Sequence, residues 1–145
     1  MRTALVKGAL GIILPTLLAA GAAAAGELRA TIHNVKPHQG KVMVALYDGA
    51  DRYKANDRRA GQMLESVGTD LTVVFSDLPA GRYGLSVFQD LDGNGQLTAN
   101  LFGIPTEPYG FSRSAAGSFG PPAFEALAVA VPATDAATTD VALTP

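Results

Sequence analysis

The sequence has no cysteine and no tryptophan, and only two of its 145 residues are histidines. Without cysteine there can be no disulfide, thiolate zinc site, iron–sulfur cluster, cysteine nucleophile or acyl anchor on an N-terminal cysteine. The two histidines, His33 and His38, leave little room for a metal site built from several imidazoles. These absences exclude several kinds of catalytic and metal site, but they do not identify a reaction.

Charged residues are also sparse, at 17% of the chain, and the formal net charge is −2. A nucleic-acid-binding domain normally carries a basic face, so this balance argues against a nucleic-acid partner. Apolar residues make up 48% of the chain, which is too hydrophobic for a disordered protein. A length of 145 residues is that of one domain.

The N-terminal segment has the layout of a secretory signal peptide. Arg2 and Lys7 form a short positive region, and an apolar stretch follows over Gly8–Leu18. Small residues then end in Ala23–Ala25, which matches the alanine pattern of a cleavage site. We therefore expect residues 1–25 to be a signal peptide that is removed on export.

A membrane anchor is the alternative interpretation of this stretch, but Pro15 interrupts it and its tail is alanine and glycine. After cleavage we expect no membrane span, and residues 26–145 form a single β-sandwich domain. An exported domain of this size without disulfides is typical of bacteria rather than of eukaryotic secretion. The expected location is the periplasm or the extracellular medium.

The remainder of the chain shows about seven short apolar or alternating segments at even spacing, with no long helical pattern. This pattern predicts an all-β fold, an antiparallel sandwich with one long loop rich in glycine and proline. The expected strands cover residues 27–35, 41–47, 63–67, 70–75, 82–90, 124–131 and 138–143. The expected core comprises Val42, Val44, Leu46, Val73, Phe75, Tyr83, Leu85 and Val87.

Short turns between these segments predict hairpins. The turn Lys36–Gly40 joins the first two segments, and Pro79–Gly81 joins the segments on either side of it. The last two segments flank a turn over Pro132–Ala137. One helical turn is expected near Asp51–Ala55, in a polar crossover.

The long loop, Asp90–Pro122, contains an Asp-x-Asp-x-Asn-Gly motif that resembles the start of a calcium-binding loop. The side chains of Asp90, Asp92 and Asn94 and the carbonyl of Gln96 are the candidate oxygen ligands for Ca²⁺.

Two interpretations of this motif are open. Leu101 stands where a calcium loop has its bidentate Glu, which predicts a weak site, and Glu107 is the nearest acid downstream that can fold back. Alternatively, the motif is a structural turn whose Asp and Asn side chains accept hydrogen bonds from their own backbone.

An aromatic block follows in the same loop. Glu107, Tyr109, Phe111 and Arg113 are candidate binding residues for a sugar, a peptide or a carboxylate. The alternative is that the aromatic rings fold inward and form a small core of the loop itself.

Catalytic patterns are weak. The sequence contains neither a G-x-S-x-G nor an H-E-x-x-H motif, and both histidines are expected to be exposed and without a catalytic role. Asp90, Asp92 and Glu107 allow a hydrolase with paired acids as an alternative. We expect that the protein is not an enzyme.

Three stretches carry a family resemblance: LPAGRYGLSVFQDLDGNGQL, NLFGIPTEPYGFS and GSFGPPAFEAL. They resemble the bacterial family known as domain of unknown function 2141, over about Glu27–Leu143. The resemblance implies an exported sandwich of prealbumin-like or immunoglobulin-like type. Members often have His before the first Asp of the loop, where this chain has Gln89.

These observations together favour a periplasmic binding or interaction module that is not an enzyme. Its long loop would form the binding surface, with calcium as a candidate cofactor. The expected partner is a small ligand or an unidentified envelope protein. The rival functions are a small hydrolase and a structural partner in an envelope complex.

Overall fold

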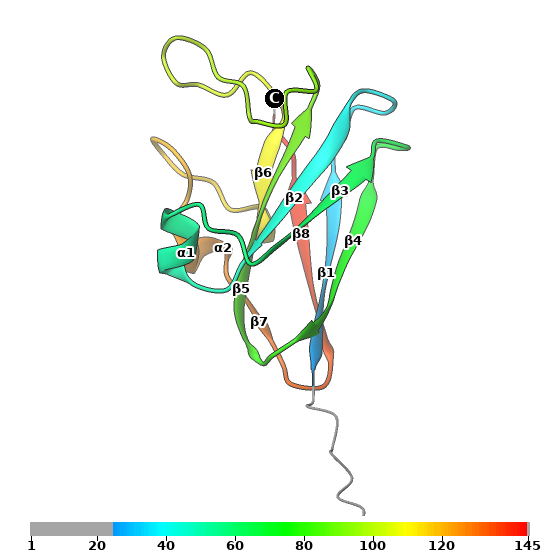
Figure 1. Cartoon of the computed structure of the whole chain (residues 1–145), viewed down its shortest axis with the longest axis vertical. Coiled ribbons are helices and arrows are strands. Elements are labelled where there is room, and N and C mark those ends of the chain that lie inside the picture. The colour runs from blue at the N-terminus through cyan, green and yellow to red at the C-terminus, as the bar shows by residue number, and fades with distance from the viewer. Residues whose placement is uncertain (1–24, 145) are drawn as a thin grey trace, which may run out of the picture.

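The computed structural model describes residues 25–144, so the predicted signal peptide lies almost wholly outside the described residues. Within these described residues, eight strands form two facing sheets (Figure 1), which confirms the all-β prediction. The smaller sheet has the order β4(Leu71–Leu78), β1(Gly26–His33), β8(Ala136–Ala142). The larger sheet has the order β3(Ala60–Glu65), β2(Lys41–Tyr47), β5(Gly81–Asp90), β6(Tyr109–Phe111), and β7(Val129–Val131) also pairs with β5.

The core lies between the two sheets and is built from alternate positions of their strands. All eight residues predicted for the core are buried, with Val42, Leu46 and Leu85 fully inaccessible. From the smaller sheet, Leu28, Ile32, Val73 and Val141 pack against them, among others. The alternation of apolar side chains in the sequence therefore predicts correctly which face of these strands is buried.

Gln89 is a buried polar residue on the inner face of β5, with none of its surface exposed. Its amide nitrogen donates to the carbonyls of Lys36 (2.7 Å) and Gln39 (2.6 Å), and its Oε1 accepts from the backbone N–H of Lys36 at 2.9 Å. Gln89 thus fixes the connection between β1 and β2 from inside the sandwich, since a buried amide must find partners.

The predicted hairpins are wrong. β1 pairs with β4 and β8, whereas β2 pairs with β3 and β5, so the turn Lys36–Gly40 connects the two sheets. The turn Pro79–Gly81 does the same between β4 and β5, and the turn after β7 leads to β8 in the other sheet. A tight turn brings two strands near each other but does not decide whether they pair side by side or face to face.

A wholly antiparallel arrangement is also wrong, because β1 and β8 run parallel along the register Glu27–His33. As a result the two ends of the described chain lie at opposite ends of the sandwich (Figure 1). Gly26 pairs with Leu78 at one end, and Thr144 pairs with Tyr109 at the other.

In the described part of the chain, three short helices complete the fold: α1(Ala50–Lys54), the 3₁₀ turn η1(Ser112–Ser114) and α2(Phe124–Leu127). The strand predicted over 124–131 is therefore helical in its first half and extended only in β7. Phe124 and Leu127, one helical turn apart, are both buried in a second apolar cluster with Tyr47. Burial of two side chains at this spacing favours a helical turn over a strand.

Candidate functional site

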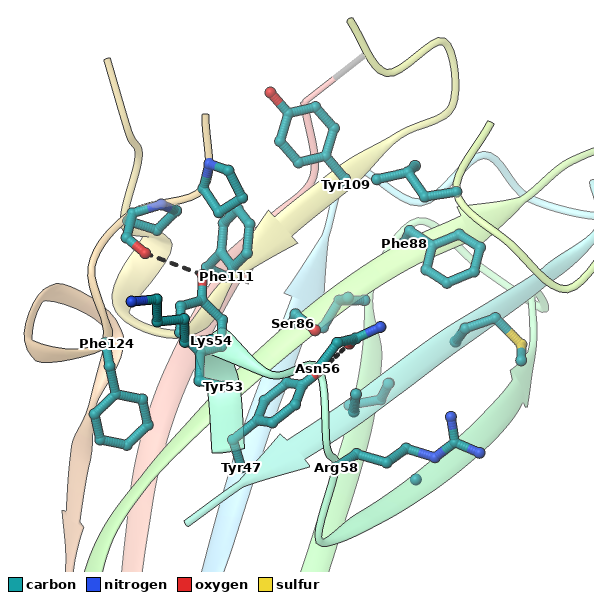
Figure 2. Close-up of a pocket in the computed structure, with 18 of the residues that line it drawn as sticks. Tyr47, Tyr53, Lys54, Asn56, Arg58, Ser86, Phe88, Tyr109, Phe111 and Phe124 are labelled. Atoms are coloured by element: carbon teal, nitrogen blue, oxygen red, sulfur yellow. Dashed lines mark hydrogen bonds between the residues drawn. The ribbon is translucent and has the colours of Figure 1, made fainter. Parts of the chain in front are cut away.

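The outer face of the larger sheet carries a row of large apolar side chains across four strands. The register places Met63 of β3 opposite Met43 of β2, Met43 opposite Phe88 of β5, and Phe88 opposite Tyr109 of β6. Such side chains normally face a core, but here they border open space (Figure 2).

The next row of the same face consists largely of small residues. Gly61, Ala45 and Ser86 lie opposite one another on β3, β2 and β5, and Phe111 of β6 ends the row. Beside the large row, these small side chains leave a hollow in the sheet surface. The two rows form the floor of a groove of about 1310 Å³, which we call the sheet groove.

Aromatic residues form one wall of the sheet groove. Tyr47 and Tyr53 pack edge to face at 5.3 Å between ring centroids, and Phe124 lies 6.0 Å from Tyr53. The Tyr53 hydroxyl donates to the carbonyl of Pro122 at 3.0 Å, which ties α1 to the segment before α2. Burial, with a smaller contribution from Tyr47, raises the pKa of Tyr53 to about 12, so this phenol is neutral in the wall. The segment Gly95–Leu97 also borders the groove.

Two cations lie on the lining of the sheet groove, Lys54 at the end of α1 and Arg58 before β3. Arg58 extends along the sheet at Gly61, where a Cβ atom would come within 3.3 Å of its Nε. Among residues 25–144, no aspartate or glutamate lines the groove. The groove is therefore apolar on its floor and positive at its rim.

A cluster of three carboxylates lies in the loop after β5. Asp90, Asp92 and Glu107 each offer an oxygen atom, and these atoms lie within 4.8 Å of one another. Asp90 and Glu107 are buried, whereas Asp92 is exposed. None of the ion pairs among residues 25–144 includes these three acids. Ca²⁺ binds oxygens at 2.3–2.6 Å, so the spacing of the three carboxylates fits one such ion.

Glu107 holds the base of this loop together. Its Oε1 accepts from the backbone N–H groups of Leu91 at 2.8 Å and Asp92 at 3.3 Å. Its Oε2 accepts from the N–H of Thr98 at 2.9 Å. A single buried side chain therefore joins both arms of the loop, which we call the acidic loop (Asp90–Glu107).

Asp90 and Asp92 close the turn itself. Asp90 accepts from the N–H groups of Gly93 (3.0 Å) and Gly95 (2.8 Å), and Asp92 accepts from that of Asn94 at 3.0 Å. The Thr98 hydroxyl also donates to Asp92 at 2.7 Å, and this bond, followed by that from Asn94, lowers the pKa of Asp92. These hydrogen bonds are the ones expected of a structural turn. Each carboxylate oxygen of Asp90 and Asp92 accepts one of them and therefore retains a lone pair for a cation.

The structure brings the predicted site residues together in part. Tyr109 and Phe111 lie on the floor of the sheet groove, whereas Glu107 belongs to the carboxylate cluster. Arg113 is exposed on η1, and its backbone N–H donates to Thr139 at 2.8 Å. The amide oxygen of Asn94 accepts from the N–H of Gln96 at 2.9 Å.

Several residues of the groove were not predicted, among them Tyr53, Lys54 and Arg58. The signal that could have found them is the apolar outer face of β2, on which Met43 borders the sheet groove and Tyr47 is buried.

A further titratable group, His33, lies on the outer face of the smaller sheet. Its Nε2 is 2.8 Å from Asp140 and its Nδ1 is 3.1 Å from Asp70. These two bonds, that to Asp140 first, raise the pKa of His33. Side-chain exposure of 37% agrees with the expected exposed position.

Within residues 25–144, no helix is long and apolar enough to cross a membrane.

Fold and site together define an all-β sandwich protein with a groove on its larger sheet and a cluster of three carboxylates in the loop after β5. The chain belongs to the bacterial family described as "Uncharacterized protein conserved in bacteria" (DUF2141), whose model matches residues 30–139. No curated protein and no solved structure matches the chain. The family resemblance is thereby confirmed, and its prealbumin-like detail stays a prediction.

Proposed function

We propose that the protein is an exported binding module that is not an enzyme, and that its ligand occupies the sheet groove. The observation that carries this proposal is the apolar row of Met63, Met43, Phe88 and Tyr109 on a solvent-facing sheet surface. An exposed apolar surface that is concave and bordered by a few polar groups is typical of ligand sites.

The arrangement of the carboxylates supports binding over hydrolysis. Asp90 and Glu107 are buried and accept hydrogen bonds from the loop backbone, so they hold the loop rather than face the sheet groove. If the protein were a hydrolase that uses these acids, a panel of glycoside and ester substrates would reveal turnover, and Glu107→Gln would abolish it.

Binding to the sheet groove can be tested with the dye 1-anilinonaphthalene-8-sulfonate, whose fluorescence rises in apolar surroundings. We expect saturable binding to the folded protein. Ala45→Trp and Ser86→Phe, which fill the floor, should each weaken it at least tenfold. Thr72→Trp, on the exposed face of β4 in the other sheet, serves as the control. Unchanged binding by both floor variants, with melting curves that show intact folds, would refute the groove as the site.

The periplasmic location is part of the proposal and rests on the predicted signal peptide over residues 1–25. N-terminal sequencing of protein from the periplasmic fraction should begin at Gly26 or within a few residues of it. An intact Met1 in a membrane pellet would contradict this assignment.

Calcium in the acidic loop is the second part of the proposal, supported by the fit of Asp90, Asp92 and Glu107 to one ion. Three carboxylates without a further bidentate ligand correspond to a dissociation constant of about 10⁻⁴ to 10⁻³ M, the range of extracellular modules. At ~10 mM calcium such a site would stabilise the fold by about 1.4–2.7 kcal/mol.

Thermal melting at increasing calcium tests this value. The double variant Asp90→Asn, Asp92→Asn should show no rise in melting temperature with calcium, and magnesium should have a smaller effect on the wild type. If ~10 mM calcium leaves the wild-type melting curve unchanged, the loop is held by its hydrogen bonds alone.

A further inference from the structure

The positive charge at the rim of the sheet groove is the feature that narrows the class of ligand. Among residues 25–144, five of nine lysines and arginines form ion pairs with acids: Arg29, Lys41, Arg52, Arg59 and Arg82. Lys54 and Arg58 belong to the four that form none, and both line the groove. The surroundings of the groove therefore leave two cations available to a ligand.

The placement of Arg58 is specific to this face of the sheet. Its side chain reaches across β3 at Gly61, where the missing Cβ leaves space for the guanidinium stem. On the same lining, Asn56 accepts the Tyr47 hydroxyl at 2.7 Å through Oδ1, which leaves the Asn56 amide N–H groups as donors (Figure 2). A guanidinium and an amide N–H together are well suited to a carboxylate, which only accepts hydrogen bonds.

The remaining residues of the groove lining are suited to contact the apolar part of a ligand. Met63, Met43, Phe88 and Tyr109 extend over four adjacent strands, which corresponds to about 14 Å at the usual strand spacing. Methionine side chains adapt to irregular apolar ligands, and the aromatic rings add flat contact surface. With no acid on the lining and nine bases against 13 acids in residues 26–145, the groove is a positive site on an acidic protein.

We propose that the sheet groove binds an amphipathic carboxylate, whose apolar chain lies on the row of large side chains and whose charged end meets Arg58, while Lys54 on the α1 side of the groove adds positive charge. This inference rests on the proposed binding function and deepens it. A fatty acid and the apolar C-terminus of a short peptide share this chemistry.

Three probes with the same alkyl chain separate charge from apolar contact: decanoate and decylammonium below their micelle concentrations, and 1-decanol below its solubility limit. Three of the four tyrosines, Tyr47, Tyr53 and Tyr109, line the groove, and the chain has no tryptophan, so tyrosine fluorescence reports occupancy. We expect decanoate to bind at least tenfold more tightly than 1-decanol, and decylammonium to bind most weakly. N-acetyl-leucyl-leucine, compared with its amide, tests the peptide source in the same assay.

The double variant Lys54→Gln, Arg58→Gln should reduce decanoate binding to the level of 1-decanol and leave 1-decanol binding unchanged. Lys36→Gln removes another exposed lysine, outside the groove, and should leave the preference intact. Equal binding of the three probes by the wild type, or the same loss in Lys36→Gln, would overturn the inference while the binding function stands. Failure of all three probes and of the dye would overturn both.

Discussion

The acidic loop depends on one buried carboxylate, and removing it tests the structure most directly. Glu107 is 4% exposed and accepts three backbone N–H groups, from Leu91, Asp92 and Thr98. Glu107→Gln keeps one acceptor oxygen and turns an NH₂ group toward an N–H donor. Glu107→Ala leaves all three N–H groups without their acceptor.

The expected loss follows from the hydrogen bonds and from the neighbouring charges. A hydrogen bond to a charged group contributes about 1.5–3 kcal/mol, so the three bonds together contribute about 5–9 kcal/mol. Removing Glu107 also relieves its repulsion by the buried Asp90, about 3–4 kcal/mol for two charges within 4.8 Å at an effective dielectric of about 20. We therefore expect a loss of about 1–2 kcal/mol for Glu107→Gln and about 2–4 kcal/mol for Glu107→Ala in calcium-free buffer. Calcium in excess should widen both differences, because each variant also loses a ligand.

Urea unfolding gives the loss of stability, and amide hydrogen exchange locates it. The N–H groups of Leu91, Asp92 and Thr98 should exchange faster in Glu107→Ala than in the wild type. Glu125→Ala, an exposed acid paired with Arg82, is the matched control and should change neither measurement appreciably. A loss below about 0.5 kcal/mol together with unchanged exchange at the three amides would refute the role given to Glu107.

Three further predictions concern the sandwich. Leu85→Ala removes a fully buried side chain and should cost about 2–5 kcal/mol in urea unfolding; a loss below about 0.5 kcal/mol would contradict its position. Gly84→Ala places a Cβ 2.1 Å from Leu127 Cδ1 and should cost about 1–3 kcal/mol by overpacking, measured in the same way. Bonds to Asp140 and Asp70 raise the pKa of His33, so they stabilise the fold fully below about pH 6.5 and cease to do so as the pH rises through the raised value. Thermal melts should show this decline in the wild type and not in His33→Gln.

Burial could be predicted from the sequence, whereas pairing could not. Alternation in β4 and β5 identified the inward side chains correctly, because a period of two depends only on which face is apolar. The same alternation carries no information on whether a turn such as Lys36–Gly40 joins neighbours in one sheet or crosses to the other. The parallel pair β1–β8 joins strands from the two ends of the domain, which local patterns do not reveal.

The acidic loop was visible in the sequence because its turn residues are contiguous. Asp90, Asp92 and Asn94 form the turn that one interpretation described, and Glu107 was noted as the acid that can fold back. The sheet groove was not visible, since its floor combines Gly61, Ala45 and Ser86 from three strands. Their juxtaposition follows from the register, which the wrong hairpins concealed.

The opposite positions of the two chain ends determine how this protein can be attached to a surface. Thr144 exchanges backbone hydrogen bonds with Tyr109 (2.9 and 3.0 Å), so a tag coupled near Thr144 would lie beside β6, whose Tyr109 lines the sheet groove. Gly26 begins β1 at the far end of the sandwich (Figure 1). Immobilisation through a linker before Gly26 would present the groove to solution, while coupling through the C-terminus would crowd it.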